Sequence, residues 1–166
     1  MSFETSGPEA DSDLSDSIQV EPPLQIPCGL ILRKEDESHK DGEVKPVETI
    51  LDTSLPTSTI TLEAVQELGL APLVVVDDSQ HGPYIPINKL WLRMGSIEAT
   101  VPSPAILVTN EVSGQFGLRL GMDFMRNNGA VVDLREEELN ILVEGSESAM
   151  VPFIRPRPSL SFGDDL

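Results

Sequence analysis

Short apolar segments, each bounded by glycine, proline or charged residues, run through most of this 166-residue chain. In the first, residues 24–32, apolar side chains alternate with their neighbours as in a half-buried strand, although Pro27 places part of it at a sheet edge. Similar segments follow at residues 44–51, 57–60, 73–76, 84–87, 90–94, 97–101, 105–108, 116–120, 130–134, 139–143 and 150–154. Such a series predicts a mostly β domain, a small closed barrel of largely antiparallel strands.

Two stretches carry the signals of short helices. Thr61 is suited to cap the N-terminus of a helix that Gly69 stops, because a threonine hydroxyl accepts a bond from the first turn. A second short helix follows Gly121 and ends at Asn128 and Gly129. The sequence therefore predicts one or two short helices beside the strands.

The chain divides into one folded domain and two tails. Residues 1–23 are rich in serine, acidic residues and proline and contain no lysine or arginine. Their few apolar side chains cannot offset the entropy of ordering them, so we expect a disordered acidic tail. The predicted domain spans residues 24–154, and a flexible C-terminal tail spans residues 155–166.

The formal net charge of −17 argues against binding to polyanions. Nucleic acids and anionic membrane surfaces both repel a chain of this charge, so neither is expected to bind it. The longest apolar run, residues 68–76, is far shorter than the ~20 residues of a membrane helix, and the N-terminus lacks a signal-peptide pattern. We expect no membrane association.

Cysteine and histidine are too few to build a metal site or a disulfide. Cys28 is the single cysteine and lies in an apolar segment, so it is interpreted as a small core residue. His39 and His81 stand far from each other and from Cys28, without metal-ligand spacing. The sequence therefore predicts no metal, no cofactor and an intracellular, cytoplasmic protein.

Asp52 is the candidate for chemistry, because it ends the apolar segment 44–51 and opens a hydroxyl-rich turn with Thr53 and Ser54. An acid at the end of a buried strand lies where water is scarce and its ionisation is adjustable. Two such carboxylates facing each other share one proton, one acting as general base on a water and the other as general acid. The alternative is that Asp52 is an ordinary turn residue capping a strand.

The chain holds no second segment of this kind. The sequence Val76-Asp77-Asp78-Ser79 continues into a loop, and Val131-Val132-Asp133-Leu134 lacks the hydroxyl. A pair of facing carboxylates therefore requires two copies of the chain, each giving one Asp52.

An ordered set of motifs carries a family resemblance: Ile50-Leu51-Asp52-Thr53-Ser54, a hairpin at residues 73–87, then Leu118-Arg119-Leu120-Gly121-Met122-Asp123-Phe124-Met125 and Val131-Val132-Asp133-Leu134. Over about residues 24–154 the chain resembles a retropepsin-like aspartic protease domain. Within that superfamily it is most similar to the eukaryotic DNA-damage-inducible ubiquitin-shuttle proteases. The resemblance implies a retropepsin-like barrel that forms a homodimer and hydrolyses polypeptides without a cofactor.

The resemblance also assigns roles to single residues. It makes Asp52 the catalytic carboxylate, Thr53 a hydroxyl that bonds across the dimer, and Ser54 part of the active-site loop. It places the tip of a flap over the substrate, formed by Ser79, Gln80, His81 and Gly82. The chain departs from the family at Ser54, where glycine is usual, and at Leu55 and Pro56, where small residues are usual.

Two functions are consistent with these residues. The first is an aspartic endopeptidase in which each copy of a homodimer supplies Asp52. The second is a catalytically degenerate retropepsin fold kept as a dimerisation or adaptor module, which Ser54 and the glycine-poor flap favour. Three other residues are interpreted as structural: Trp91 as core or interface, Asp123 as a charge at a helix N-terminus, and Gly121 as the point of close packing beneath the active loop.

Overall fold

The computed structural model describes residues 24–33, 42–77, 82–95, 99–111, 116–143 and 147–154. The expected tails 1–23 and 155–166 lie outside these residues. So do Ser79, Gln80 and His81 of the expected flap tip.

The described residues form strands, two α-helices and one 3₁₀ helix. The strands are β1 Leu24–Leu32, β2 Lys45–Leu51, β3 Thr59–Thr61, β4 Tyr84–Ile85, β5 Leu90–Met94, β6 Ala99–Pro102, β7 Ile106–Thr109, β8 Leu118–Leu120, β9 Val131–Asp133, β10 Glu138–Val143 and β11 Glu147–Pro152. The helices are α2 Leu62–Glu67, η1 Ala71–Leu73 and α3 Met122–Asn127.

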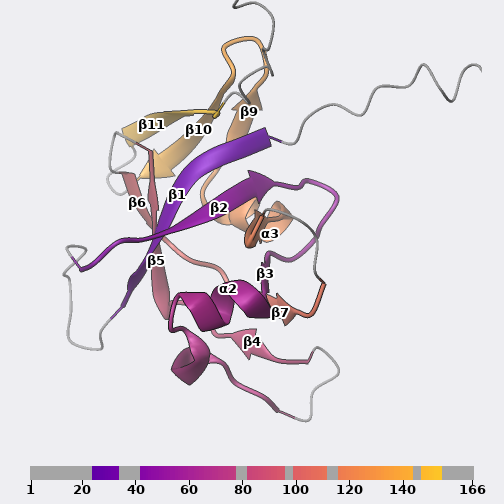
Figure 1. Cartoon of the computed structure of the whole chain (residues 1–166). Coiled ribbons are helices and arrows are strands. Elements are labelled where there is room, and N and C mark those ends of the chain that lie inside the picture. Colours follow the sequence, from indigo (N-terminus) through magenta and orange to yellow (C-terminus); the bar gives the residue numbers. More distant parts are fainter. Residues whose placement is uncertain are drawn as a thin grey trace, which may run out of the picture.

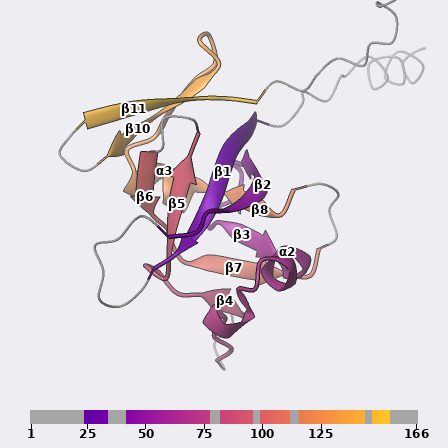
Figure 2. The same cartoon turned by 60° about the vertical axis from the view of Figure 1, so that its left-hand side comes forward.

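Eight strands form one sheet in the order β4-β7-β3-β8-β2-β1-β5-β6, which curls into a half-barrel (Figure 1). The β2–β8 and β3–β7 pairs are parallel and the other pairs are antiparallel. Strands β9, β10 and β11 form a second sheet, which lies at the opposite end of the molecule from β4 in both views (Figure 2). The predicted mostly β fold with two short helices is confirmed, and its larger sheet is a curled half-barrel with β4 and β6 at its two ends.

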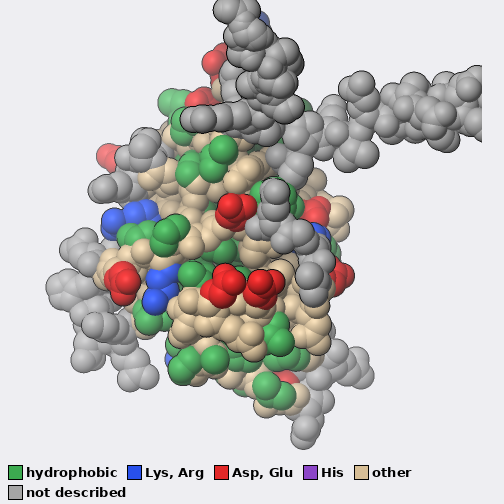
Figure 3. Space-filling model, in the orientation of Figure 1, with side chains coloured by type: hydrophobic (Ala, Val, Ile, Leu, Met, Phe, Trp, Pro, Cys, Tyr) green, Lys and Arg blue, Asp and Glu red, His purple; other side chains and the backbone are tan. Residues whose placement is uncertain are grey.

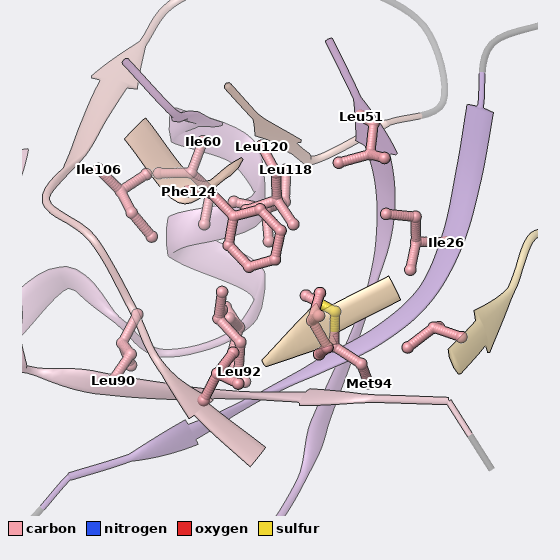
Figure 4. Close-up of a cluster of buried hydrophobic side chains, with 14 of the residues drawn as sticks. Ile26, Leu51, Ile60, Leu90, Leu92, Met94, Ile106, Leu118, Leu120 and Phe124 are labelled. Carbon is pink, nitrogen blue, oxygen red and sulfur yellow. The ribbon is translucent and has the colours of Figure 1, made fainter. Parts of the chain in front are cut away.

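The core lies inside the curl of the large sheet. Phe124 of α3 is fully buried, and Figure 4 shows it among Ile60 of β3 and Leu118 and Leu120 of β8. Trp91 is also buried, at 5% exposed, in agreement with its interpretation as a core residue. This packing fixes α3 against β3 and β8, and β8 pairs with β2, the strand that leads into Asp52.

The capping residues in the sequence predicted the positions of both α-helices correctly. The Thr61 side chain accepts a hydrogen bond from the Ala64 N–H at 3.1 Å, and the turn after α2 contains Gly69 at a φ of +68°. Helix α3 ends at Asn127, with Asn128 as its C-cap, followed by Gly129 at a φ of +52°. No helix among the described residues is long and apolar enough to cross a membrane.

The buried strand expected at residues 73–76 is wrong. Leu73 is the last residue of η1, which contains Pro72, and of residues 74–76 only Val75 makes a bridge, an isolated one to Tyr84. Val76 is 76% exposed. Proline fixes φ at a value that suits such a turn, and an apolar run without periodicity does not distinguish a strand from other structures.

The first strand is less regular than its alternating sequence suggests. β1 pairs with β2 along most of its length, whereas its ladder with β5 begins only at Cys28, just after Pro27. Leu30 and Ile31 are both fully buried, and Leu32 is 38% exposed. The strict alternation fails because Leu30 and Ile31, which point to opposite faces of the strand, are both covered.

Candidate active site

Asp52 lies where β2 leaves the sheet. β2 runs parallel to β8 as far as the Leu51–Leu120 pair, and the Asp52 N–H continues the ladder by donating to the Leu120 carbonyl at 2.9 Å. Leu51 is buried and Asp52 is half-buried, so the carboxylate stands at the boundary between core and surface. Because β8 lies between β2 and β3, the loop of residues 52–58 passes over the end of β8. We call it the active loop.

The two oxygens of the Asp52 carboxylate have different surroundings. Oδ1 accepts the Ser54 N–H at 3.1 Å and the Ser54 hydroxyl at 2.5 Å. The Leu55 N–H closes the same turn by donating to the Asp52 carbonyl at 3.1 Å. No hydrogen bond from the described residues reaches Oδ2. The loop therefore fixes the carboxylate through one oxygen and leaves the other for a water or a second carboxylate.

Thr53 and Ser54 are both exposed at the turn. The bond from Thr53 across a dimer needs a second copy and stays a prediction. Ser54 keeps the backbone N–H that a glycine would supply and adds a hydroxyl to the same carboxylate oxygen. With serine in place of glycine, Asp52 Oδ1 thus accepts two hydrogen bonds from residue 54 and not one.

Gly121 is the point where the active loop packs most closely on the structure beneath it. A Cβ added there would lie 2.5 Å from the Leu55 carbonyl oxygen and 3.1 Å from the Leu55 Cβ. Its φ of −98° and ψ of −163° are extended, so the need for glycine arises from space and not from conformation. The prediction that Gly121 permits close packing beneath the loop is confirmed.

Two backbone hydrogen bonds dock the middle of the loop onto the start of α3. The Met122 N–H donates to the Leu55 carbonyl at 2.8 Å, and the Asp123 N–H donates to the Pro56 carbonyl at 3.2 Å. These N–H groups belong to the first turn of a helix, where no carbonyl of the same helix is available to accept them. The loop therefore supplies the cap that α3 needs.

A side-chain cluster at the end of the loop was not predicted. Ser58 is fully buried, and its hydroxyl donates to Asp123 Oδ1 at 2.7 Å and accepts the Gly121 N–H at 3.0 Å. The Ser58 N–H lies 3.0 Å from each Asp123 oxygen. Asp123 does lie in the first turn of α3, as expected, but its carboxylate binds the active loop. Ser58 and Asp123 are 65 positions apart, and no local pattern links them.

The base of the expected flap is held mainly by backbone bonds. Val75 and Tyr84 exchange hydrogen bonds of 2.8 and 3.1 Å, and the Val108 N–H donates to the Pro83 carbonyl at 2.9 Å. The Tyr84 hydroxyl donates to Asp77 at 3.2 Å, and the negative charge of Asp77 raises the pKa of Tyr84. Gly82 has a φ of +76°. Substrate contacts by Ser79, Gln80, His81 and Gly82 stay a prediction.

Cys28 does not belong to this site. Burial of its thiol, which outweighs the hydrogen bond with Thr49, raises the pKa of Cys28 to about 12, although the residue as a whole is only partly covered. The thiol is therefore protonated and unreactive near neutral pH. Cys28 borders a hollow of about 400 Å³, and no residue of the active loop lines that hollow. The lining residues are Gln25, Ile26, Pro27, Cys28, Pro46, Val47, Glu48 and Ile154.

A metal site is absent from the residues that the structure describes. In the described residues, no group of three or more histidine, cysteine or acidic side chains is placed to hold a metal ion. Acidic side chains gather over α2, which carries Glu63 and Glu67 (Figure 3).

Comparison with solved structures gives the fold. The chain is similar to the crystal structure of the retroviral protease-like domain of Ddi1 from Leishmania major, with a TM-score of 0.58 and 18% sequence identity. The match covers 81% of this chain and 98% of that one. Comparison of the sequence with protein-family models and with curated protein sequences gives no match. The protein therefore has the retroviral protease-like fold that its motifs predicted.

Proposed function

We propose that the protein is an aspartic endopeptidase that acts as a homodimer, with Asp52 of each copy forming the catalytic pair. The observation that carries the proposal is the Asp52 carboxylate, fixed by its own loop through Oδ1 while Oδ2 is bound by no described residue. The retroviral protease-like fold and the close packing of the loop on Gly121 support it.

The reaction follows from two carboxylates sharing one proton. The ionised Asp52 takes a proton from a water, whose oxygen attacks the carbonyl carbon of the scissile peptide bond. The protonated Asp52 gives its proton to the carbonyl oxygen, producing a tetrahedral diol. Collapse of the diol breaks the C–N bond: one carboxyl of the pair gives its proton to the leaving nitrogen, and the other carboxylate takes a proton from a diol hydroxyl. The products are a carboxylic acid and an amine, and the pair again holds one proton. The cycle needs no metal or cofactor.

The substrate class is an extended polypeptide. A chain lying beside exposed strands binds through main-chain hydrogen bonds, with pockets for alternate side chains. We place Ser79, Gln80, His81 and Gly82 above it as the flap. The expected cytoplasmic location stays a prediction.

The homodimer is required because the chain carries a single Asp52 motif. The two ends of the folded region meet, since the Ile154 N–H donates to the Gln25 carbonyl at 2.8 Å. We propose that residues 24–28 and 151–154 form much of the dimer interface. Light scattering should give about twice the chain mass of 18.0 kDa. A mass of one chain at every concentration would contradict the proposal.

The direct test is cleavage of an unfolded protein substrate by the wild type and by Asp52→Asn, from acid to neutral pH. Asp52→Asn should abolish cleavage. The matched control is Asp133→Asn, because Asp133 also ends a strand and accepts turn N–H groups, from Arg135 at 3.1 Å and Glu136 at 3.0 Å. That variant should cleave like the wild type. Cleavage that persists in Asp52→Asn would remove Asp52 from the mechanism.

Ser54→Gly separates a protease from a degenerate module. Removing the hydroxyl withdraws one donor from Oδ1 and opens space at the dimer axis, while the backbone N–H remains. We therefore expect higher activity in Ser54→Gly than in the wild type. If neither protein cleaves at any pH tested, the dimerisation or adaptor module becomes the better interpretation.

A further inference from the structure

We propose that Ser58 and Asp123 are positioning residues that hold the active loop, and with it Asp52, in its working geometry. The inference rests on the proposed function for its catalytic consequence. Its structural part, that this pair orders residues 52–58, is independent of any activity. We call the two residues the Ser58–Asp123 lock.

The active loop is anchored at every stage to the short stretch of residues 120–123. Its start is bound at Leu120, since the Asp52 N–H donates there at 2.9 Å. Its middle is bound by the Met122 and Asp123 N–H groups. Its end is bound by the Ser58–Asp123 lock. A displacement of Asp123 therefore reaches Asp52 through the loop.

Ser58 stands at the centre of the lock. Its hydroxyl accepts from the Gly121 N–H at 3.0 Å and donates to Asp123 Oδ1 at 2.7 Å, so one buried oxygen links the loop, the packing glycine and the helix. Ser58 is fully buried, and water cannot replace these bonds without rearrangement. Loss of the hydroxyl leaves the Gly121 N–H without this acceptor.

Asp123 binds through hydrogen-bond donors. The Ser58 N–H, the Ser58 hydroxyl and the Phe124 N–H, the last at 2.7 Å, all reach Oδ1, whereas Oδ2 meets only the Ser58 N–H. The described residues give this carboxylate no ion pair. An asparagine whose oxygen takes the place of Oδ1 can accept the same three donors, so Asp123→Asn should keep part of the lock that Asp123→Ala loses.

The catalytic consequence should appear in kcat. A misplacement of about 1 Å at a reacting group can cost on the order of 100-fold in rate. Binding of an extended peptide depends on the strands and flap, whereas the side-chain hydrogen bonds of the lock join the active loop to Gly121 and α3. The strand contact of the lock among the described residues, the Leu107 N–H of β7 donating to the Ser58 carbonyl at 3.0 Å, is a backbone bond that the substitutions leave in place. We therefore expect Ser58→Ala and Asp123→Asn to lower kcat about tenfold or more, with KM changed less than about twofold.

The experiment combines kinetics with hydrogen–deuterium exchange on the full chain. Variants are Ser58→Ala, Asp123→Asn and Asp123→Ala. The matched control is Asn128→Ala, because Asn128 is also buried and bonds the opposite end of α3, through Nδ2 to the Phe124 carbonyl at 3.0 Å. It should destabilise the helix without touching the active loop. Ser58→Ala and Asp123→Asn keep the test decisive if Asp123→Ala does not fold.

Exchange in peptides covering residues 52–58 should quicken about tenfold or more in Ser58→Ala and Asp123→Ala, less in Asp123→Asn, and not at all in Asn128→Ala. Peptides from β1 and β5 should exchange at the wild-type rate throughout. Unchanged exchange at residues 52–58 in Ser58→Ala, or equal acceleration over the whole chain, would overturn the lock. If the wild type cleaves nothing, the proposed function fails while the exchange rates still decide the lock.

Discussion

The active loop and the base of the flap are held in opposite ways, although the proposed reaction uses both. The loop is docked on β8 and α3 by backbone bonds and by the Ser58–Asp123 lock. At the flap base, the described residues 74–77 and 82–84 are joined mainly by the Val75–Tyr84 pair, and Val76 is largely exposed. The described active loop is therefore held by backbone and side-chain bonds to two elements, whereas the described flap base is held mainly by backbone bonds.

Gly121, beneath the active loop, and Gly82, at the flap base, are required for different reasons. At Gly121 the conformation suits any residue, but an added Cβ would meet a backbone oxygen. At Gly82 an added Cβ would meet nothing within 4 Å, but the φ of +76° disfavours any other side chain. One glycine is required by packing and the other by backbone conformation. The same substitution at each position therefore measures a different property.

Gly121→Ala should have the larger effect. Its Cβ would be 2.5 Å from the Leu55 carbonyl oxygen, which is backbone and cannot rotate away, so the active loop must shift. Overpacking of this kind costs about 1–3 kcal/mol. Thermal denaturation should show a Tm lower by at least about 2 °C. Peptide cleavage should fall with it, because Asp52 moves with the loop.

Gly121→Ser is the companion variant and should be no better, since it carries the same Cβ. A Tm for Gly121→Ala equal to that of the wild type would show that the loop is not closely packed. The comparison between the two regions would then fail.

The local features of this design were predictable from the sequence. Asp52 follows a strand whose last residues, Ile50 and Leu51, are buried, and the caps at Thr61 and Gly129 follow from side-chain chemistry and positive φ. Each of these signals lies within a few residues of the structure that it predicts. The packing role of Gly121 was anticipated from its place in the family motif.

The features missed by the sequence analysis depend on contacts between distant segments. Ser58 and Asp123 are ordinary polar residues until the fold brings them together. The apolar run at residues 73–76 has the composition of a buried strand, but among the described residues it pairs only through the single bridge at Val75. Strand preference depends on what packs against the strand, and a single sequence does not contain that information.

Gly82→Ala should have a smaller effect than Gly121→Ala. A non-glycine residue in the left-handed region costs about 1 kcal/mol, and no neighbour adds to that cost here. Gly82→Asn should lose less, because asparagine adopts this conformation more readily. Denaturation of both variants beside the wild type provides the measurement. A larger loss for Gly82→Asn than for Gly82→Ala would show that Gly82 is needed for space.

The smallest effect concerns the Tyr84–Asp77 bond, the side-chain tie described at the flap base. It is exposed, so Tyr84→Phe should leave the Tm at neutral pH nearly unchanged. Its effect should appear in alkali, because the Asp77 charge disfavours the phenolate and raises the pKa of Tyr84 above the ordinary value of 10.0. The folded state thus holds the phenolic proton more tightly than the unfolded chain. The resulting stability is fully present below pH 10.0 and is lost as the pH rises through the folded pKa.

Tyr84 is the single tyrosine of the chain, so the phenolate absorbance reports it alone. The titration midpoint should be higher in the folded protein than in urea, and Asp77→Asn should bring the folded midpoint down toward the unfolded one. Above pH 10, the free energy of unfolding should fall with pH in the wild type. Ionisation of residue 84 should add no such fall in Tyr84→Phe, because phenylalanine has no proton to release. A folded midpoint at or below the unfolded one would mean that Asp77 does not face Tyr84 in solution. The flap base would then be held by its backbone bonds, and its contrast with the locked active loop would be greater still.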